Sequence, residues 1–261
     1  MAKNILSYNK KGGCGKTTIA SNLASYLVNC KLIEMDTINQ SDSKINSKNY
    51  YESEQFDFLS ELDDKFFKFE KMLRTSDKNL IIDVGANKLS TFHKAMIVND
   101  LYSKIDLFVI NGMDGADDFF VAIDYLESIK EHVDLKNKVI FSFNRFNEHE
   151  YTDVKSQFEQ FFTNAEIIHK KYGVDLKNED NYFAIKDSLA IKYARRNKMT
   201  LKELCDKDLD DLTIQIDNLS LDEDEQLMLL IKQKNIIKNA LNLQKNYILP
   251  AIQKIIKKLE N

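Results

Sequence analysis

The stretch Asn9-Lys-Lys-Gly-Gly-Cys-Gly-Lys-Thr-Thr18 decides the fold of this chain. A short apolar run, Asn4–Tyr8, precedes it, and a helical pattern, Lys16–Val28, follows it. Glycines between a strand and a helix let backbone N–H groups converge on phosphate oxygens at the positive end of the helix. We therefore expect a nucleotide-binding loop, with a plain glycine-rich turn as the alternative. Its expected members are Lys11, Gly12, Gly13, Cys14, Gly15, Lys16, Thr17 and Thr18.

Strand-length apolar runs recur along the chain and alternate with longer amphipathic stretches. The further runs are Lys31–Met35, Asn79–Val84, Asp106–Asn111 and Lys138–Phe143. Helical patterns cover Gly115–His132 and Glu150–Phe162. Strands that alternate with helices indicate βαβ units, and runs that are apolar throughout indicate strands buried on both faces. The sequence predicts a doubly wound, mostly parallel α/β sheet of the P-loop type with a helical C-terminal appendage.

The composition excludes several classes of protein. The chain has 261 residues, of which 43% are hydrophobic and 30% charged, so it can form a substantial core. The three cysteines have no zinc-site spacing, and their odd number argues against a disulfide framework. No signal peptide precedes the first strand, so we expect a cytoplasmic protein. The net charge of −4 means that any contact with DNA requires a local basic patch.

Beyond about residue 190 the pattern is helical only. Ser188–Asn197 and Thr200–Cys205 predict short helices, the second opened by a capping box of Thr200 and Glu203. From Asp206 to Glu225 nine acids accompany one base, whereas from Gln226 to Asn261 seven lysines accompany one acid. We expect an ATPase domain over residues 1–205 and a helical extension over residues 206–261 packed on its side.

The loop Lys11-Gly-Gly-Cys-Gly-Lys-Thr17 resembles the deviant Walker A motif, K-G-G-x-G-K-T, of the ParA/MinD family of P-loop ATPases. The resemblance implies slow, Mg²⁺-dependent ATP hydrolysis that a partner protein stimulates. It also implies a homodimer that forms on ATP binding, in which Lys11 reaches the phosphates of the partner. A second cation at the γ-phosphate would stabilise transition-state charge, as an arginine finger does. Lys16 supplies the usual lysine near the β- and γ-phosphates.

Two carboxylates follow apolar strands. Asp36 matches the family's water-positioning aspartate, which makes Lys11, Lys16 and Asp36 the catalytic candidates; capping of the next loop is the alternative for Asp36. Asp83 matches the Walker B aspartate, so Thr17 and Asp83 are the expected Mg²⁺ ligands. The family's prolines after this aspartate are absent here.

The pair Asn144-Arg145 closes a predicted strand where many relatives carry the same two residues. By resemblance both residues bind the nucleotide. An asparagine amide both donates and accepts, which suits the edge of adenine, while a turn-forming asparagine is the alternative.

Two surfaces are candidates for larger partners. Lys192, Arg195, Arg196 and Lys198 form a compact basic cluster that would bind DNA phosphates without sequence preference, or would be only a solvated helix face. The amphipathic segment Pro250–Leu259 resembles the membrane-binding helix of MinD-type relatives, but we expect it to pack on the core.

The leading hypothesis is a ParA-like ATPase for plasmid or chromosome partition, associated with the nucleoid if it binds DNA. Its activator would be a ParB-like protein. One alternative is an accessory ATPase of conjugative transfer, acting with transfer-machinery proteins and favoured by the unusual segment Asp83-Val-Gly-Ala86. The other is a MinD-like positioning ATPase on a membrane.

Overall fold

The computed structural model describes residues 2–35, 50–219 and 224–260. Within these ranges a seven-stranded sheet has the order β3-β2-β4-β1-β5-β6-β7, and every pairing is parallel. The predicted doubly wound α/β class is confirmed. The strands are β1 (Asn4–Tyr8), β2 (Cys30–Met35), β3 (Glu52–Gln55), β4 (Asn79–Val84), β5 (Leu107–Gly112), β6 (Val139–Phe146) and β7 (Tyr182–Lys186).

The five apolar runs all form strands, whereas the two edge strands were not predicted. The edge strand β3 has the sequence Glu-Ser-Glu-Gln and exposes most of its side chains. Pairing with β2 stabilises it, and Glu54 accepts hydrogen bonds from Lys31 and Lys68. An edge strand with polar side chains lacks the apolar run on which a sequence-based assignment depends.

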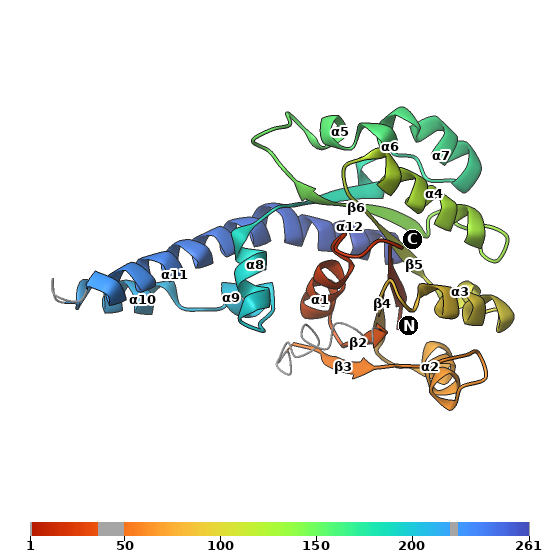
Figure 1. Cartoon of the computed structure of the whole chain (residues 1–261), viewed down its shortest axis with the longest axis horizontal. Coiled ribbons are helices and arrows are strands. Elements are labelled where there is room, and N and C mark those ends of the chain that lie inside the picture. Colours follow the sequence, from red (N-terminus) through yellow and green to blue (C-terminus); the bar gives the residue numbers. More distant parts are fainter. Residues whose placement is uncertain (1, 36–49, 220–223, 261) are drawn as a thin grey trace.

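Helices cover both faces of the sheet, as Figure 1 shows. The first half of the chain provides α1 (Lys16–Tyr26), α2 (Asp64–Thr75), α3 (Leu89–Val98) and α4 (Ala116–Ile129). The second half provides α5 (Val154–Gln157), α6 (Glu159–Thr163), α7 (Ala165–Tyr172), α8 (Leu189–Arg196), α9 (Leu201–Cys205), α10 (Leu209–Asp217), α11 (Asp224–Leu243) and α12 (Leu249–Glu260). Single turns form η1 (Tyr102–Lys104) and η2 (Glu179–Asn181), and a π-helical turn forms η3 (Gln244–Ile248).

The core divides into one apolar layer on each face. Leu6 and Ile82 pack with α2, α3, α4, α6 and α7, whereas their neighbours Ile5 and Ile81 pack with α1, α8, α9 and the C-terminal helices. Successive side chains of a strand point to opposite faces, so a strand buried on both sides is apolar at every position. This is why the bounds of β1 and β4 agree with those predicted.

The predicted helix Glu150–Phe162 is wrong in its start and its continuity. The Asp153 side chain accepts a hydrogen bond from the Ser156 N–H and caps α5, which therefore begins at Val154. Phe158 then leaves helical geometry, with φ −104° and ψ 37°, and separates α5 from α6. The capping box at Thr200 and Glu203 is confirmed, with hydrogen bonds of 3.0 and 2.6 Å.

The C-terminal segment is one long helix. Leu243 and Leu249, on either side of the π-helical turn η3, both have helical dihedral angles, so α11, η3 and α12 are continuous. Pro250 therefore lies inside a helix rather than at the start of one. A proline within a helix removes an i→i−4 hydrogen bond, and a π-turn is one way to accommodate that loss.

The amphipathic C-terminal helix packs on the sheet, as expected. Ala251, Ile252 and Ile255 are buried in the same layer as strand residues. The Lys254 ammonium donates to the carbonyls of Glu179 and Tyr182, at 2.6 and 3.0 Å. None of the helices in the described ranges is long and apolar enough to cross a membrane.

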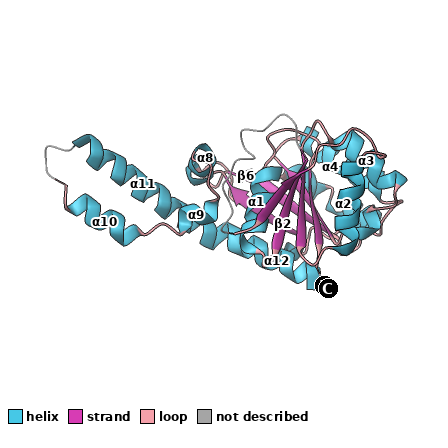
Figure 2. Cartoon of the chain, turned by 90° about the horizontal axis from the view of Figure 1, so that it is seen from below, coloured by secondary structure: helices cyan, strands magenta, loops and turns pink. Residues whose placement is uncertain are grey.

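The first half of α11 and all of α10 project from the body of the protein. Figures 1 and 2 show these two helices side by side, reaching beyond α8 and α9 and away from the sheet. The second half of α11 returns to the core, where Ile237, Ala240 and Leu243 are buried.

Candidate functional site

The glycine-rich loop connects the carboxyl end of β1 to the first turn of α1. Gly13 and Gly15 have φ values of +75° and +96°, a region that side chains with a Cβ rarely adopt. Gly15 is also the residue that immediately precedes α1. The loop therefore turns sharply and aims its amides along the axis of α1, which is the arrangement that binds phosphate at a helix N-terminus.

Gly15 is constrained by space as well as by dihedral angle. A Cβ at this position would lie 2.8 Å from the Cγ of Asn144. A Cβ at Gly12 would meet nothing within 4 Å. The loop is therefore closely supported beneath Gly15 and open at Gly12, as a phosphate cradle requires.

Lys16 lies inside the loop. Its side chain is largely buried, and its ammonium donates a 2.8 Å hydrogen bond to the carbonyl of Lys11. The positive charge therefore sits within the curve of the loop, where the bound phosphates of P-loop proteins are found.

Lys11 is paired within its own chain. Its Nζ lies 2.9 Å from Oδ2 of Asp118 and 4.0 Å from a carboxylate oxygen of Asp117, in the first turn of α4. The hydrogen bond to Asp118 is the main cause of a raised Lys11 pKa. The other carboxylate oxygen of Asp118 is buried and receives no hydrogen bond from the described residues. Asp118 was not among the site residues expected from the sequence.

Asn144 and Arg145 both hold the loop from beneath. The Asn144 amide donates to the carbonyl of Cys14 at 2.9 Å, and the Arg145 guanidinium donates to the carbonyl of Gly13 at 3.0 Å. Consecutive strand residues normally point to opposite faces, but β6 is irregular here and Arg145 has a φ of +60°. Such a bulge redirects a side chain, and here it brings both residues to the loop.

Behind this contact lies a buried network of amides and hydroxyls. Asn111 donates to the Ser7 hydroxyl at 3.0 Å and accepts from Asn144 at 3.1 Å. Asn9 donates to the Asn111 carbonyl and accepts from the Lys11 N–H. Sequence analysis missed Asn9 and Asn111, although each is a polar residue at the carboxyl end of an apolar run. Adenine contact by Asn144 stays a prediction, since its amide is buried and supports the loop.

Asp83 and Thr17 are the predicted Mg²⁺ ligands. Asp83 stands in register beside Ser7 near the carboxyl end of β4, so it adjoins the strand that leads into the loop. Asp83 is 7% exposed, while Thr17 is partly exposed at the start of α1. A hydroxyl and a carboxylate beside a phosphate cradle fit Mg²⁺, which takes few protein ligands and keeps water and phosphate oxygens. Asp36 lies outside the described residues.

The Cys14 thiol is buried in the loop and is not a reactive group. Burial raises its pKa, and it donates a hydrogen bond to the Lys11 carbonyl. A thiol with a raised pKa is a poor nucleophile, so the position serves packing. Among the described residues no cluster of His, Cys, Asp and Glu could hold a metal ion by itself.

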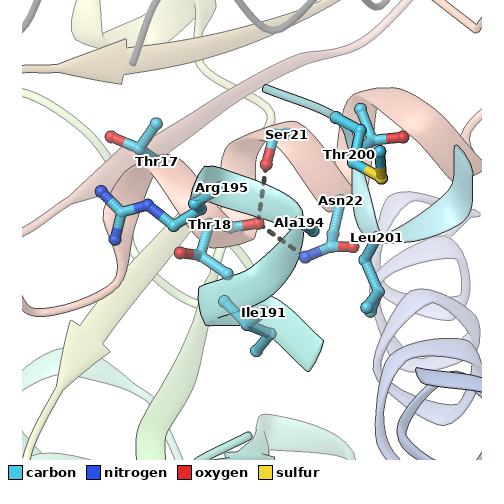
Figure 3. A pocket seen from close by; sticks show the side chains of 10 residues that line it. Thr17, Thr18, Ser21, Asn22, Ile191, Ala194, Arg195, Thr200 and Leu201 are labelled. Carbon is cyan, nitrogen blue, oxygen red and sulfur yellow. Dashed lines mark hydrogen bonds between the residues drawn. The ribbon is translucent and has the colours of Figure 1, made fainter. Parts of the chain in front are cut away.

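The basic cluster lies on α8 and the turn after it. Lys192, Arg195, Arg196 and Lys198 are all exposed. Lys192 pairs with Asp187 at 2.9 Å. Arg195 also lines a pocket with Thr17 and Thr18, and Figure 3 shows its guanidinium beside these threonines. The structure thus places Arg195, one of the predicted DNA contacts, beside the start of α1, which follows the glycine-rich loop.

Comparison with known proteins gives structural neighbours only. No protein-family model and no curated protein matches the chain. A plasmid partition protein of Borrelia burgdorferi B31 bound to AMPPNP is 17% identical, with a TM-score of 0.53, and the match covers 93% of this chain and 99% of that one. A second B. burgdorferi partition protein (17% identical, TM-score 0.47, 76% and 94% covered) and a Cyanothece McdA variant with ATP (15%, 0.41, 93% and 97%) also match. The chain therefore has the fold of an AMPPNP-bound plasmid partition protein.

Proposed function

We propose that this chain is a ParA-like ATPase that acts in DNA partition. The observation that carries the proposal is the loop itself, in which Lys16 lies within a curve made by two glycines of positive φ while Lys11 stands at its edge. The fold shared with an AMPPNP-bound partition protein supports it.

The proposed site gives each residue that the sequence singled out a role. The loop amides and the Lys16 ammonium would bind the phosphates, and Asp36 would position the attacking water. Thr17 and Asp83 would hold Mg²⁺, which when bound would neutralise charge on the phosphate oxygens. Asn144 and Arg145 would fix the loop beneath them. The domain of residues 1–205 would carry this chemistry.

A homodimer that forms on ATP binding would bring Lys11 to the phosphates of the partner. That movement requires Lys11 to leave Asp118, at 2.9 Å in this structure. Lys11 would then have two alternative partners, Asp118 of its own chain and the phosphates bound by the partner. Binding of ATP and of the partner would have to displace Asp118 from Lys11.

The exposed cations of α8 are the proposed contacts with DNA. The logarithm of the DNA-binding constant falls linearly with the logarithm of the salt concentration, and the steepness of this salt slope is about 0.9 per phosphate that a Lys or Arg neutralises. Removal of one such side chain should therefore lower the steepness by about 0.9. Two copies in a dimer would double a patch that is weak alone. A ParB-like activator would then stimulate hydrolysis and release.

Nucleotide binding is tested first, by titrating a fluorescent ATP analogue with Mg²⁺ into the wild type and Lys16→Ala. Lys16→Ala should lose productive binding, whereas Lys10→Ala, at an exposed neighbouring position, should keep it. Equal affinity in all three proteins would reject the site.

DNA binding is tested by fluorescence anisotropy on an arbitrary duplex with ATP and Mg²⁺, with ADP and without nucleotide, across a salt series. Arg196→Ala should reduce the salt slope by about one. Lys170→Ala, an exposed change on α7, should leave it unchanged. Nucleotide binding without DNA binding in any state would favour the transfer-associated alternative.

A further inference from the structure

Three carbonyl groups of the glycine-rich loop are each held by a side chain. Lys16 donates to the carbonyl of Lys11, Arg145 to that of Gly13 and Asn144 to that of Cys14, at 2.8, 3.0 and 2.9 Å. In a planar trans peptide the C=O of one residue and the N–H of the next point in opposite directions, and the loop contains no cis peptide. The N–H groups that follow the three carbonyls therefore point away from the side chains that hold them.

These N–H groups belong to Gly12, Cys14 and Gly15. No described residue accepts a hydrogen bond from any of them. Successive backbone N–H groups that converge without a partner of their own form a concavity that binds anions. The side chains that hold the carbonyls thus orient the donors of the proposed phosphate site, and they do so before any nucleotide is bound.

The contact with Cys14 depends on a further residue, because Asn144 is itself held by Asn111. The Asn144 amide donates to the side-chain oxygen of Asn111 at 3.1 Å. Asn111 is 0% exposed, and its NH₂ group donates to the Ser7 hydroxyl at 3.0 Å. The same NH₂ group lies 3.2 Å from the carbonyls of Tyr8 and of Val109. With acceptors around its nitrogen and a donor at its oxygen, the Asn111 amide has one orientation that satisfies all of these bonds.

The other two held carbonyls do not depend on the Asn111 side chain. Lys16 and Arg145 donate directly to the loop, and neither makes a hydrogen bond with Asn111 among the described contacts. The N–H of Gly12 is therefore oriented through Lys16, whereas that of Gly15 is oriented through Asn144 and Asn111. The two amides lie in one loop but depend on different side chains.

We propose that Asn111 is a positioning residue for phosphate binding. Its side chain fixes the Asn144 amide, Asn144 fixes the Cys14 carbonyl, and the Gly15 N–H is thereby aimed at the bound phosphate. The Asn111 side chain acts through Asn144 and does not itself contact the phosphate. This role rests on the proposed function, since it takes the glycine-rich loop to bind the phosphates of a nucleotide.

The first test compares affinities for inorganic pyrophosphate and for ATP, each with Mg²⁺, by isothermal titration calorimetry on the full chain. Asn111→Leu keeps a branched side chain but makes no hydrogen bond. It should weaken both ligands by more than about tenfold, because a hydrogen bond to a charged oxygen loses its alignment. Pyrophosphate has no base, so a loss shared by both ligands places the effect at the phosphates. Asn111→Ala is the second variant, in case leucine does not fit.

Asn4→Leu and Asn4→Ala are the matched controls. Asn4 is also a buried asparagine, 9% exposed, and its amide donates to the carbonyls of Leu73 and Lys104 at 2.9 Å each. It stands at the opposite end of β1 from the loop. The control variants should lose stability but keep the affinity of the wild type. Melting temperatures show that every variant is folded where affinity is measured.

The second test observes the two loop amides directly. In the NMR spectrum of the ¹⁵N-labelled full chain, the Gly12 and Gly15 amide signals of the wild type should both shift when pyrophosphate is added. In Asn111→Leu the Gly15 signal should lose most of its shift, whereas the Gly12 signal should keep it. A general loosening of the protein would affect both amides alike.

Three results would overturn the role of Asn111. Both Asn111 variants could bind pyrophosphate and ATP as the wild type does. The Asn4 variants could lose as much affinity as the Asn111 variants. The Gly12 and Gly15 signals could change to the same extent in Asn111→Leu. A wild type that binds neither ligand would instead refute the proposed function, and this role with it.

Discussion

Removal of the Asn144 amide tests whether this residue supports the glycine-rich loop or contacts the adenine base of the nucleotide. In Asn144→Ala, the Cys14 carbonyl loses a 2.9 Å hydrogen bond and the Asn111 side-chain oxygen loses one of 3.1 Å. Both acceptors belong to residues that are at most 1% exposed, so water does not readily replace the donor. Asn144→Asp keeps the shape but places a carboxylate against the same two acceptors.

The expected loss of stability follows from these contacts. Each unpaired buried acceptor costs about 1–3 kcal/mol, so the loss of both bonds in Asn144→Ala should lower the free energy of unfolding of the nucleotide-free protein by at least about 2 kcal/mol. For a chain of this size a loss of that minimum lowers the melting temperature by roughly 4–8 °C, and a larger loss lowers it further. Asn144→Asp should lose more, because it also buries an unpaired charge.

The assay combines thermal unfolding without nucleotide and affinities for ATP and GTP. A supporting residue predicts a lower melting temperature and a similar weakening for both nucleotides. A residue that only reads adenine predicts an unchanged melting temperature and a lost preference for ATP, and that pattern would refute the reasoning. Asn242→Ala, at an exposed amide of α11, is the control and should change stability by less than about 0.5 kcal/mol.

Three further predictions concern the loop, the thiols and a helix cap. Gly15→Ala should destabilise the nucleotide-free protein by more than the ~1–2 kcal/mol of its left-handed backbone, because its Cβ would also contact Asn144, whereas Gly12→Ala should melt like the wild type. Burial raises the pKa of Cys30 and of Cys205 to about 12 each. Above about pH 9 the unfolded chain therefore releases protons that the folded chain retains, and stability falls by up to about 1.4 kcal/mol per thiol per pH unit. Urea midpoints at about pH 8 and pH 10 check this, and a smaller fall in Cys30→Ala/Cys205→Ala is expected; an equal fall would rule these thiols out. Thr200→Ala should cost about 1 kcal/mol in a urea titration, and no change would show that its capping box is dispensable.

The sequence predicted the elements whose signal is local. The runs at β1 and β4 are apolar because both of their faces are buried, and the glycine-rich loop is contiguous in the chain. The strand β3 could not be found this way, since pairing with β2 rather than its own side chains makes it a strand.

The missing parts of the site depend on contacts between distant residues. Asp118 is 107 residues from Lys11, and no feature of a single sequence joins them. The acidic pair Asp117-Asp118 in the first turn of a helix after a strand was the available signal. Acidic residues at this place also stabilise a helix through its dipole, so the pair does not by itself indicate a partner for Lys11. The support of the loop by Asn144 and Arg145 depends on a bulge in β6, which their sequence alone does not specify.

The continuous C-terminal helix has a consequence for how this chain tolerates insertions and deletions. At about 1.5 Å per residue, the rod from Asp224 to Glu260 is roughly 55 Å long, and its far end is anchored under the sheet by Ile252 and Ile255. One residue added or removed between Leu243 and Pro250 would turn Ile237, Ala240 and Leu243 by roughly 100° about the rod relative to Ile252 and Ile255, so both groups could no longer be buried in the same core. The length of this stretch therefore keeps the two anchored parts of the rod in phase, and with them the direction in which the first half of α11 leaves the core.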